Sequence, residues 1–179
     1  MRPHRGIHHR GYLPHIDRPG LVQFVTYRLA DALPVGTRAR PVTAEDDVDA
    51  QLDRGYGSCV LALPAVAEVV VGNWRHLAAG RYDLCAWVVM PNHVHLVLRV
   101  HAGQPLDRLV QSWKSYTAKR INAITGRAGR VWQSEYHDRY VRDEAGYAAA
   151  LAYVENNPVA AGLCSAAQDW RWSSAWRAH

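Results

Sequence analysis

The stretch "MPNHVHLVL", residues 90–98, decides the fold, because it places two histidines one residue apart at the start of an apolar run. Side chains on a strand alternate between its two faces, so His93 and His95 point the same way. The apolar residues Val94, Leu96, Leu98 and Val100 then point to the opposite face. We therefore expect one face of this strand to pack in the core and the other to begin with two imidazoles.

Two imidazoles at this spacing can direct neutral nitrogens at one divalent metal ion. A catalytic metal site needs at least one more ligand and an open coordination position. An isolated pair of this kind also occurs as two partly exposed histidines without a ligand role. The spacing alone leaves both interpretations open.

The segments on either side predict an α+β protein with a ferredoxin-like antiparallel sheet and helices mainly on one face. Strands are expected at 21–29, 82–90, 93–100 and 130–141, with Pro91 and Asn92 turning the chain between the middle two. Helices are expected at 63–80, 105–125 and 143–157. A short helix is expected from residue 44, capped by Thr43.

Local signals define these helices further. Pro64 suits the first turn of the helix at 63–80, and Gly80 suits its end. An apolar stripe is expected on the helix at 105–125, formed by Leu106, Leu109, Trp113 and Tyr116. Pro158 disfavours helical geometry at Asn157 and should end or kink the last helix.

Composition indicates a single soluble domain with a polyanionic partner. The 179 residues carry a formal charge of +5, and the sequence pI is near 9.3. Cys59, Cys85 and Cys164 are odd in number and widely spaced, which predicts neither a disulfide framework nor a zinc site. The sequence shows no signal-peptide core and no apolar run of about 18 residues, so we expect no membrane span and a cytoplasmic, nucleoid-associated location.

Three parts of the chain are expected. Residues 1–20 are rich in His, Arg, Gly and Pro and are interpreted as a basic arm rather than a packed element. Residues 21–163 form the predicted domain. Residues 164–179 form an aromatic and basic tail.

A second polar pair lies in the stretch "AYVENNPVAAG", residues 152–162. Tyr153 and Asn157 are four residues apart on the expected helix and share one face. A phenol can act as a nucleophile, and an amide carbonyl oxygen suits a hard cation. A core tyrosine followed by an Asn-Asn-Pro helix stop explains the same spacing.

Taken together, several motifs resemble the REP-associated tyrosine transposases, which are HUH one-tyrosine enzymes related to the single-strand transposases of small bacterial insertion sequences. The matching stretches are "VVMPNHVHLVL", "WKSYTAKRIN", "VWQSEYHDRYVRDE", "YVENNPVAAGL" and "WRWSS", preceded by "HRGYLPH" and "QFVTYRLADALP". They occur in the expected order along almost the entire chain.

The resemblance implies an enzyme, a metal-dependent transposase that cuts and rejoins single-stranded DNA beside short palindromic hairpins. It implies that His93, His95 and Asn157 hold Mg²⁺ or Mn²⁺. Tyr153 matches the nucleophile, which would form a covalent 5′-phosphotyrosine intermediate. Tyr136 is the serious rival nucleophile, and we interpret it as structural or DNA-contacting.

Several residues are candidate DNA contacts, each with a simpler alternative. Lys114 and Ser115 could contact phosphate or lie on a solvated helix face. Arg139 and Arg142 could contact the DNA backbone or pair with nearby acidic residues. Arg10 and Tyr12 could reach a hairpin from the arm, although a disordered tail would look the same.

Two other functions fit the same residues. The chain could be a host-recruited protein that binds hairpins without cutting, or a metal-dependent hydrolase in which water is the nucleophile. Among the relatives the chain resembles, those of insertion sequences exchange the tyrosine helix in a dimer. A monomer is favoured here over such a homodimer.

Overall fold

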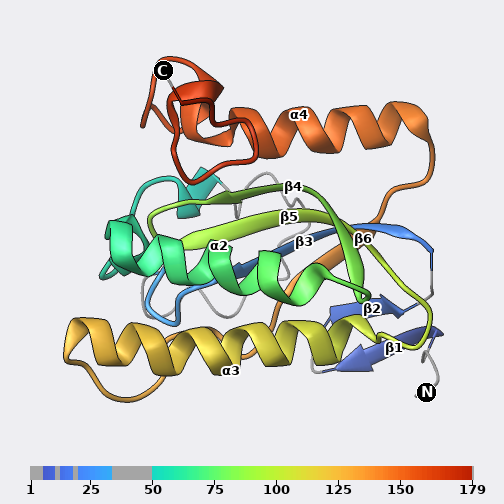
Figure 1. The fold of residues 1–179 in the computed structure, drawn as a ribbon, viewed down its shortest axis with the longest axis horizontal. Helices are drawn as coiled ribbons and strands as arrows, with labels where there is room; N and C mark the ends of the chain where they lie inside the picture. The colour runs from blue at the N-terminus through green and yellow to red at the C-terminus, as the bar shows by residue number, and fades with distance from the viewer. Residues whose placement is uncertain (1–5, 11–12, 18–19, 34–49, 179) are drawn as a thin grey trace.

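Four antiparallel strands form the central sheet of the computed structural model (Figure 1). They are β3 (Val22–Arg28), β4 (Tyr82–Val89), β5 (His93–Val100) and β6 (His137–Tyr140), in the order β4-β5-β3-β6. The structure describes residues 6–10, 13–17, 20–33 and 50–178, with side chains from residue 20 onward.

The order of strands in the sheet is that of a ferredoxin-like fold. The first strand of this sheet in the chain, β3, lies between the third and the fourth, β5 and β6. Strand β4 pairs with β5 through the tight turn at residues 91–92. The α+β, ferredoxin-like fold predicted from the sequence is confirmed.

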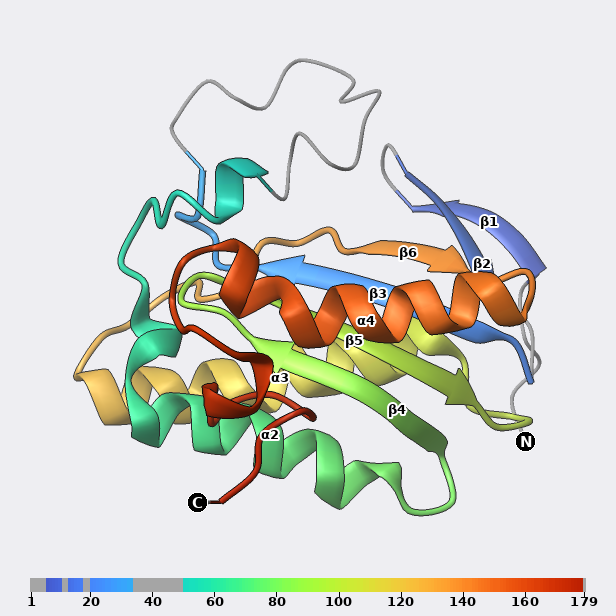
Figure 2. The ribbon, with the colours of Figure 1, turned by 90° about the horizontal axis from the view of Figure 1, so that it is seen from above.

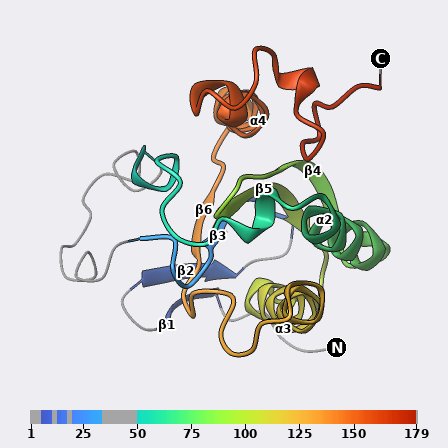
Figure 3. The ribbon, with the colours of Figure 1, turned by 90° about the vertical axis from the view of Figure 1, so that its left-hand side faces the viewer.

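Helices α2 (Pro64–Ala78) and α3 (Leu106–Thr125) cover one face of the sheet (Figures 1 and 3). The apolar face of β5 packs against them, as the alternation predicts, and all four of its apolar side chains are fully buried. Trp74 from α2 and Trp113 from α3 are also fully buried in this larger core. Burial of this apolar surface is the main stabilising contribution.

Helix α4 (Glu144–Ala160) covers the opposite face, the one that carries the histidines (Figures 1 and 3). A second, smaller core joins it to the sheet and contains Phe24, Ala86, Val88, Met90, Val97, Ala150 and Val154. Two of the three long helices thus lie on one face. The third is held directly over the face of His93 and His95.

The limits of α4 differ from the sequence prediction at one end. Asp143 caps its start, and its side chain accepts a hydrogen bond of 2.7 Å from the Gly146 N–H. The predicted end at Asn157 is wrong, since Pro158 lies inside the helix, which continues to Ala160. Pro158 removes one backbone donor in the last turn, where a single lost helical bond is tolerated.

Helix α3 differs from its predicted stripe at one position. Leu106, Leu109 and Trp113 are buried as expected, but Tyr116 is 50% exposed. The buried stripe continues instead through Thr117 and Ile121. A helix turns 3.6 residues per turn, so position 117 rather than 116 follows 113 on the same face.

The strand predicted at 130–141 is much shorter in the structure. Only His137–Tyr140 form β6, and residues before it run irregularly past the end of β3. Trp132 forms an isolated bridge with Leu29, and its indole N–H donates to Thr117 Oγ1 at 2.9 Å. The aromatic residues of this segment are therefore fixed by core contacts rather than by sheet pairing.

The N-terminal arm contains regular structure that the sequence did not predict. Strands β1 (Gly6–Arg10) and β2 (Leu13–Asp17) pair as a separate antiparallel hairpin. The interpretation of residues 1–20 as lacking a packed element is thus wrong for these two segments. Thr43 and most of the short helix expected from residue 44 lie outside the described residues.

The C-terminal tail lies along the free edge of β4 (Figure 2). The N–H of Val89 donates to the carbonyl of Trp172, and the N–H of Ser174 donates to the carbonyl of Trp87. Short 3₁₀ turns, η2 (Val60–Ala62) and η3 (Ala167–Asp169), complete the described elements. Within the described residues, we find no helix with the length and apolar character needed to cross a membrane.

Candidate metal and tyrosine site

The two histidines of β5 direct nitrogens at one point beneath α4. Both side chains are fully buried, and His93 Nε2 lies 3.1 Å from His95 Nε2. Two adjacent ligands of one octahedral ion are separated by about 3.0 Å when each bond is about 2.1 Å long. The observed separation therefore suits shared coordination of one divalent cation, and it also suits one N–H···N hydrogen bond.

Asn92, in the turn before β5, orients His93. Its amide nitrogen donates to the carbonyls of Leu52 and Tyr56, at 3.0 and 3.1 Å. The amide oxygen is thereby fixed as an acceptor, and it lies 2.8 Å from His93 Nδ1. His93 Nδ1 must therefore carry the hydrogen, which leaves the Nε2 lone pair of the neutral ring directed at His95.

Thr26 on β3 orients His95. Its hydroxyl lies 2.7 Å from His95 Nδ1 and can donate or accept, so it satisfies either tautomer of the ring. Burial, with a smaller contribution from the positive charge of Arg139, lowers the pKa of His95 to about 3. His95 is therefore neutral at physiological pH, the form that binds metals.

Tyr153 on α4 packs against the histidine pair on the sheet face that α4 covers. Its ring meets the His95 ring edge-on, with centroids 5.6 Å apart and planes at 79°. It also packs edge-on against Phe24, at 5.7 Å. The side chain is half-buried rather than sealed in the core. The structure thus brings together the tyrosine and the histidines that the sequence singled out.

Asn157 lies one helical turn after Tyr153 and is 3% exposed. Its amide oxygen is buried and accepts no hydrogen bond from any residue that the structure describes. A buried carbonyl oxygen without a donor costs free energy, about 1–3 kcal/mol. A bound cation would satisfy this oxygen, and the assignment of Asn157 as a metal ligand stays a prediction.

Asp53 is a neighbour of the site that the sequence did not indicate. Its Oδ1 atom lies 3.8 Å from His93 Nε2, and the side chain is 22% exposed. Within residues 20–33 and 50–178, no three His, Cys, Asp or Glu side chains are already arranged to hold a metal. A cation at this site would therefore be bound by the two histidines and the amide oxygen of Asn157, together with at least one further oxygen ligand.

Two arginines lie on the same face of the sheet as the histidines. Arg139 on β6 stacks over Phe24, with its guanidinium carbon 4.6 Å from the ring centroid. Arg28 pairs with His93 in the β3–β5 register, two residues after Thr26 on the same face. Arg139 was predicted as a DNA contact, whereas Arg28 was not. Both add positive charge to the face of the sheet that carries the histidines.

The other predicted DNA contacts lie elsewhere. Arg142 stacks over Tyr140, with its guanidinium carbon 5.4 Å from the ring centroid, beyond the end of β6. The side chain of Arg10 and all of Tyr12 lie outside the described part of the structure. For all three residues, contact with DNA stays a prediction.

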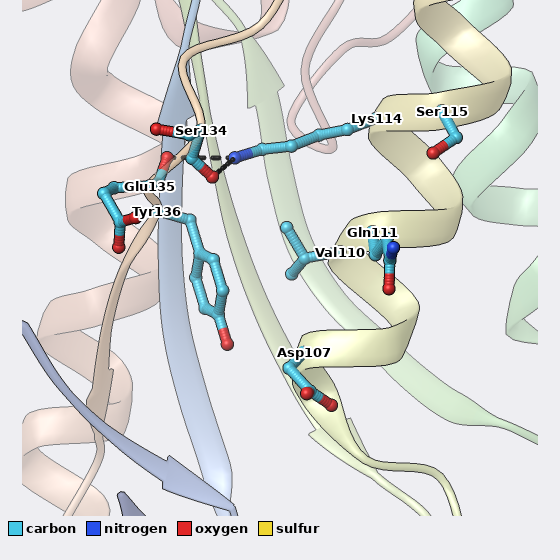
Figure 4. A pocket seen from close by; sticks show the side chains of 8 residues that line it. All are labelled: Asp107, Val110, Gln111, Lys114, Ser115, Ser134, Glu135 and Tyr136. Carbon is cyan, nitrogen blue, oxygen red and sulfur yellow. Dashed lines mark hydrogen bonds between the residues drawn. The ribbon is translucent and has the colours of Figure 1, made fainter. Parts of the chain in front are cut away.

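Lys114 and Ser115 line a pocket between α3 and the segment before β6 (Figure 4). Lys114 Nζ donates to the carbonyls of Gln133, Ser134 and Glu135, at 3.0, 3.3 and 2.9 Å. An ammonium group has three donors, so these bonds engage all of them. The structure thus gives Lys114 a task in holding this segment, and phosphate contact by Lys114 or Ser115 stays a prediction.

Tyr136, the rival nucleophile, also lines this pocket (Figure 4). It is 4% exposed and belongs to the core formed with α2 and α3. Lys114 Nζ lies 5.7 Å from its ring centroid. Tyr136 therefore lies on the side of the sheet away from the histidines, which agrees with a structural role.

The neighbours of the histidines that sequence reasoning missed come from other segments of the chain. Thr26 lies two residues before Arg28 on a strand that reads as core, and Asn92 was interpreted only as a turn residue. Asp53 is separated from His93 by forty positions, so no local pattern connects the two. A polar residue inside an apolar strand was the one signal that could have indicated Thr26.

The segment of this chain that holds the site is similar to transposases of the IS200-like class. A family model described as "Transposase IS200 like" matches residues 75–157, a segment that contains both histidines, Tyr153 and Asn157. The resemblance predicted from the sequence motifs is thereby confirmed.

Two individual proteins are similar to this chain. The solved structure of a REP-associated tyrosine transposase bound to a REP hairpin has 18% sequence identity and a TM-score of 0.58, covering 92% of this chain and 82% of that one. This likeness shows the shared fold. An uncharacterised protein of Haemophilus influenzae is 30% identical over 94 residues, covering 41% of this chain and 52% of that protein. The chain thus matches about half the length of this relative.

Proposed function

We propose that this protein is a metal-dependent single-stranded DNA endonuclease and strand transferase that acts at palindromic repeat hairpins through Tyr153. The observation that carries the proposal is the edge-on contact between Tyr153 and His95, with ring centroids 5.6 Å apart. The two side chains come from α4 and β5, and the residues are 58 positions apart in the chain. The REP hairpin bound to the structurally similar transposase supports the choice of substrate.

In the proposed reaction, the Tyr153 oxygen attacks the scissile phosphorus and loses its proton to solvent. The bond between phosphorus and the 3′-oxygen breaks, and that oxygen leaves as a 3′-hydroxyl after taking up a proton. The 5′-phosphate stays on Tyr153. A 3′-hydroxyl can then attack the phosphotyrosine, which re-forms a phosphodiester and releases the phenol.

His93, His95 and Asn157 would hold Mg²⁺ or Mn²⁺ beside Tyr153. The bound cation would polarise a phosphate oxygen and offset the negative charge that develops in the transition state. The guanidinium of Arg139 adds a second positive charge on the same side of the sheet. Because His95 remains neutral at physiological pH, its nitrogen is available for coordination rather than protonated.

The test is the formation of an SDS-stable adduct between the protein and a labelled single-stranded hairpin oligonucleotide in Mn²⁺. We expect the adduct with the natural sequence and its loss in Tyr153→Phe. Tyr136→Phe is the matched control and should retain the adduct. Cleaved ends without an adduct would identify a hydrolase instead. Hairpin binding without cleavage in the natural sequence would identify a recruited binding protein.

A further inference from the structure

We propose that Asp53 supplies a carboxylate ligand to the divalent cation held by His93 and His95. This inference rests on the proposed function, because it concerns the same cation. Asp53 Oδ1 lies 3.8 Å from His93 Nε2, and that same nitrogen lies 3.1 Å from His95 Nε2. His93 Nε2 therefore has both a carboxylate oxygen and a second imidazole nitrogen within 4 Å.

The chain fixes Asp53 in this place through Asn92. The amide nitrogen of Asn92 donates to the carbonyls of Leu52 and Tyr56, which flank Asp53 on either side. The amide oxygen of the same side chain is bonded to His93 Nδ1. A single buried side chain thus fastens the turn that carries Asp53 to the histidine that Asp53 faces.

The core anchors this turn as well. Leu52, the residue before Asp53, is 1% exposed and belongs to the larger hydrophobic core. The backbone at Asp53 is therefore held on one side by apolar packing and on the other by the bond to Asn92. Because the turn is anchored, the carboxylate is held beside His93 even though the side chain is 22% exposed.

The chemistry of the donor set favours a carboxylate at this position. Two neutral imidazoles and the amide oxygen of Asn157 bring no negative charge to a divalent cation. Mg²⁺ and Mn²⁺ favour oxygen ligands, and in proteins carboxylates commonly supply them. A carboxylate from Asp53 would add negative charge to this donor set and so favour a divalent cation there.

Asp53 and His93 need to move only slightly closer together to bind the same cation. Adjacent ligand atoms on one octahedral ion lie about 3.0 Å apart, whereas Asp53 Oδ1 and His93 Nε2 are separated by 3.8 Å. Asp53 Oδ1, the atom nearest His93 Nε2, is itself buried.

The experiment measures Mn²⁺ affinity of the full chain by titration calorimetry and by the loss of the free-ion electron spin resonance signal. We expect Asp53→Asn to weaken Mn²⁺ binding at least tenfold and Asp53→Glu to restore part of it. Asp83→Asn is the matched control, since Asp83 is 57% exposed and pairs with His101 instead. Equal Mn²⁺ affinity of Asp53→Asn and the natural sequence, within twofold, would overturn the assignment.

His93→Ala and His95→Ala separate this inference from the proposed function. If these variants lose Mn²⁺ binding while Asp53→Asn keeps it, only the role of Asp53 is wrong. If none of them changes Mn²⁺ affinity, the metal site itself is wrong. Thermal unfolding in EDTA checks folding, and a similar midpoint in all variants assigns the losses of affinity to missing ligands.

Discussion

Thr26 Oγ1 lies 2.7 Å from His95 Nδ1 across the β3–β5 ladder, and this bond sets the direction of the imidazole. The hydroxyl is held in place because Thr26 is 7% exposed and faces His95 directly in the strand register. Loss of a partner that orients a metal-binding histidine typically lowers metal affinity by about 10–100-fold. The position of Thr26 therefore leads to the first prediction.

Thr26→Val removes the oxygen and keeps the shape of the side chain. We expect Mn²⁺ affinity to fall about tenfold, since the His95 ring loses the bond that fixes its orientation. Mn²⁺ titration of both proteins measures the effect. Thr125→Val, at the end of α3, is the control and should leave the affinity unchanged. An unaltered affinity in Thr26→Val would show that His95 needs no such partner.

Asn157→Leu tests whether the buried amide oxygen binds the cation and lowers the folding stability of the protein when no cation is present. In EDTA we expect the variant to be as stable as the natural sequence or more stable by about 1 kcal/mol, because a buried acceptor without a donor is removed. Mn²⁺ should stabilise the natural sequence against thermal unfolding, but not the variant. A variant that is destabilised in EDTA and still stabilised by Mn²⁺ would contradict the ligand assignment.

Lys114→Met tests whether this lysine stabilises the segment before β6. Loss of the bonds to three consecutive carbonyls should reduce the free energy of unfolding by about 1–3 kcal/mol. Urea unfolding measures this change, and Lys119→Met, on the exposed surface of α3, should change it little.

Hairpin binding by Lys114→Met gives an independent readout. A lysine that contacts phosphate contributes to the salt dependence of DNA affinity, with a slope change of about one unit. Because its donors are engaged by carbonyls, we expect the slope of Lys114→Met to equal that of the natural sequence. A slope reduced by one unit would support the phosphate contact of Lys114 that was predicted from the sequence.

Ser174 joins the tail to the tyrosine helix. Its hydroxyl donates to a Glu155 carboxylate oxygen at 3.1 Å and accepts from the Trp87 N–H at 3.1 Å. In a double-mutant cycle of Ser174→Ala and Glu155→Gln, we expect a coupling free energy of about 1 kcal/mol. Amide hydrogen exchange around Tyr153 should be faster in both single variants than in Ser165→Ala. Additive effects and unchanged exchange would show that the tail does not hold α4.

The spacing of apolar residues along the expected helices and strands was enough to predict most of the fold. The two faces of β5 follow from the alternation of "HVHLVL", and α2, α3 and the β4–β5 hairpin follow from their apolar patterns. The errors lie where longer-range contacts dominate. Pro158 is accommodated inside α4, and Trp132 is fixed by Thr117 and a single bridge to Leu29 rather than by a strand.

By itself, the sequence determined that His93 and His95 share a face and that Tyr153 and Asn157 share another, since each pair lies within one regular element. Only the tertiary structure decided that these two faces meet, because α4 packs on the histidine side of the sheet while α2 and α3 fill the other. Tertiary structure also placed Thr26, Asn92 and Asp53 around the histidines. Hydrogen bonds and packing between segments far apart in the chain depend on the fold. They produce no regular spacing of residues that could be recognised in the sequence.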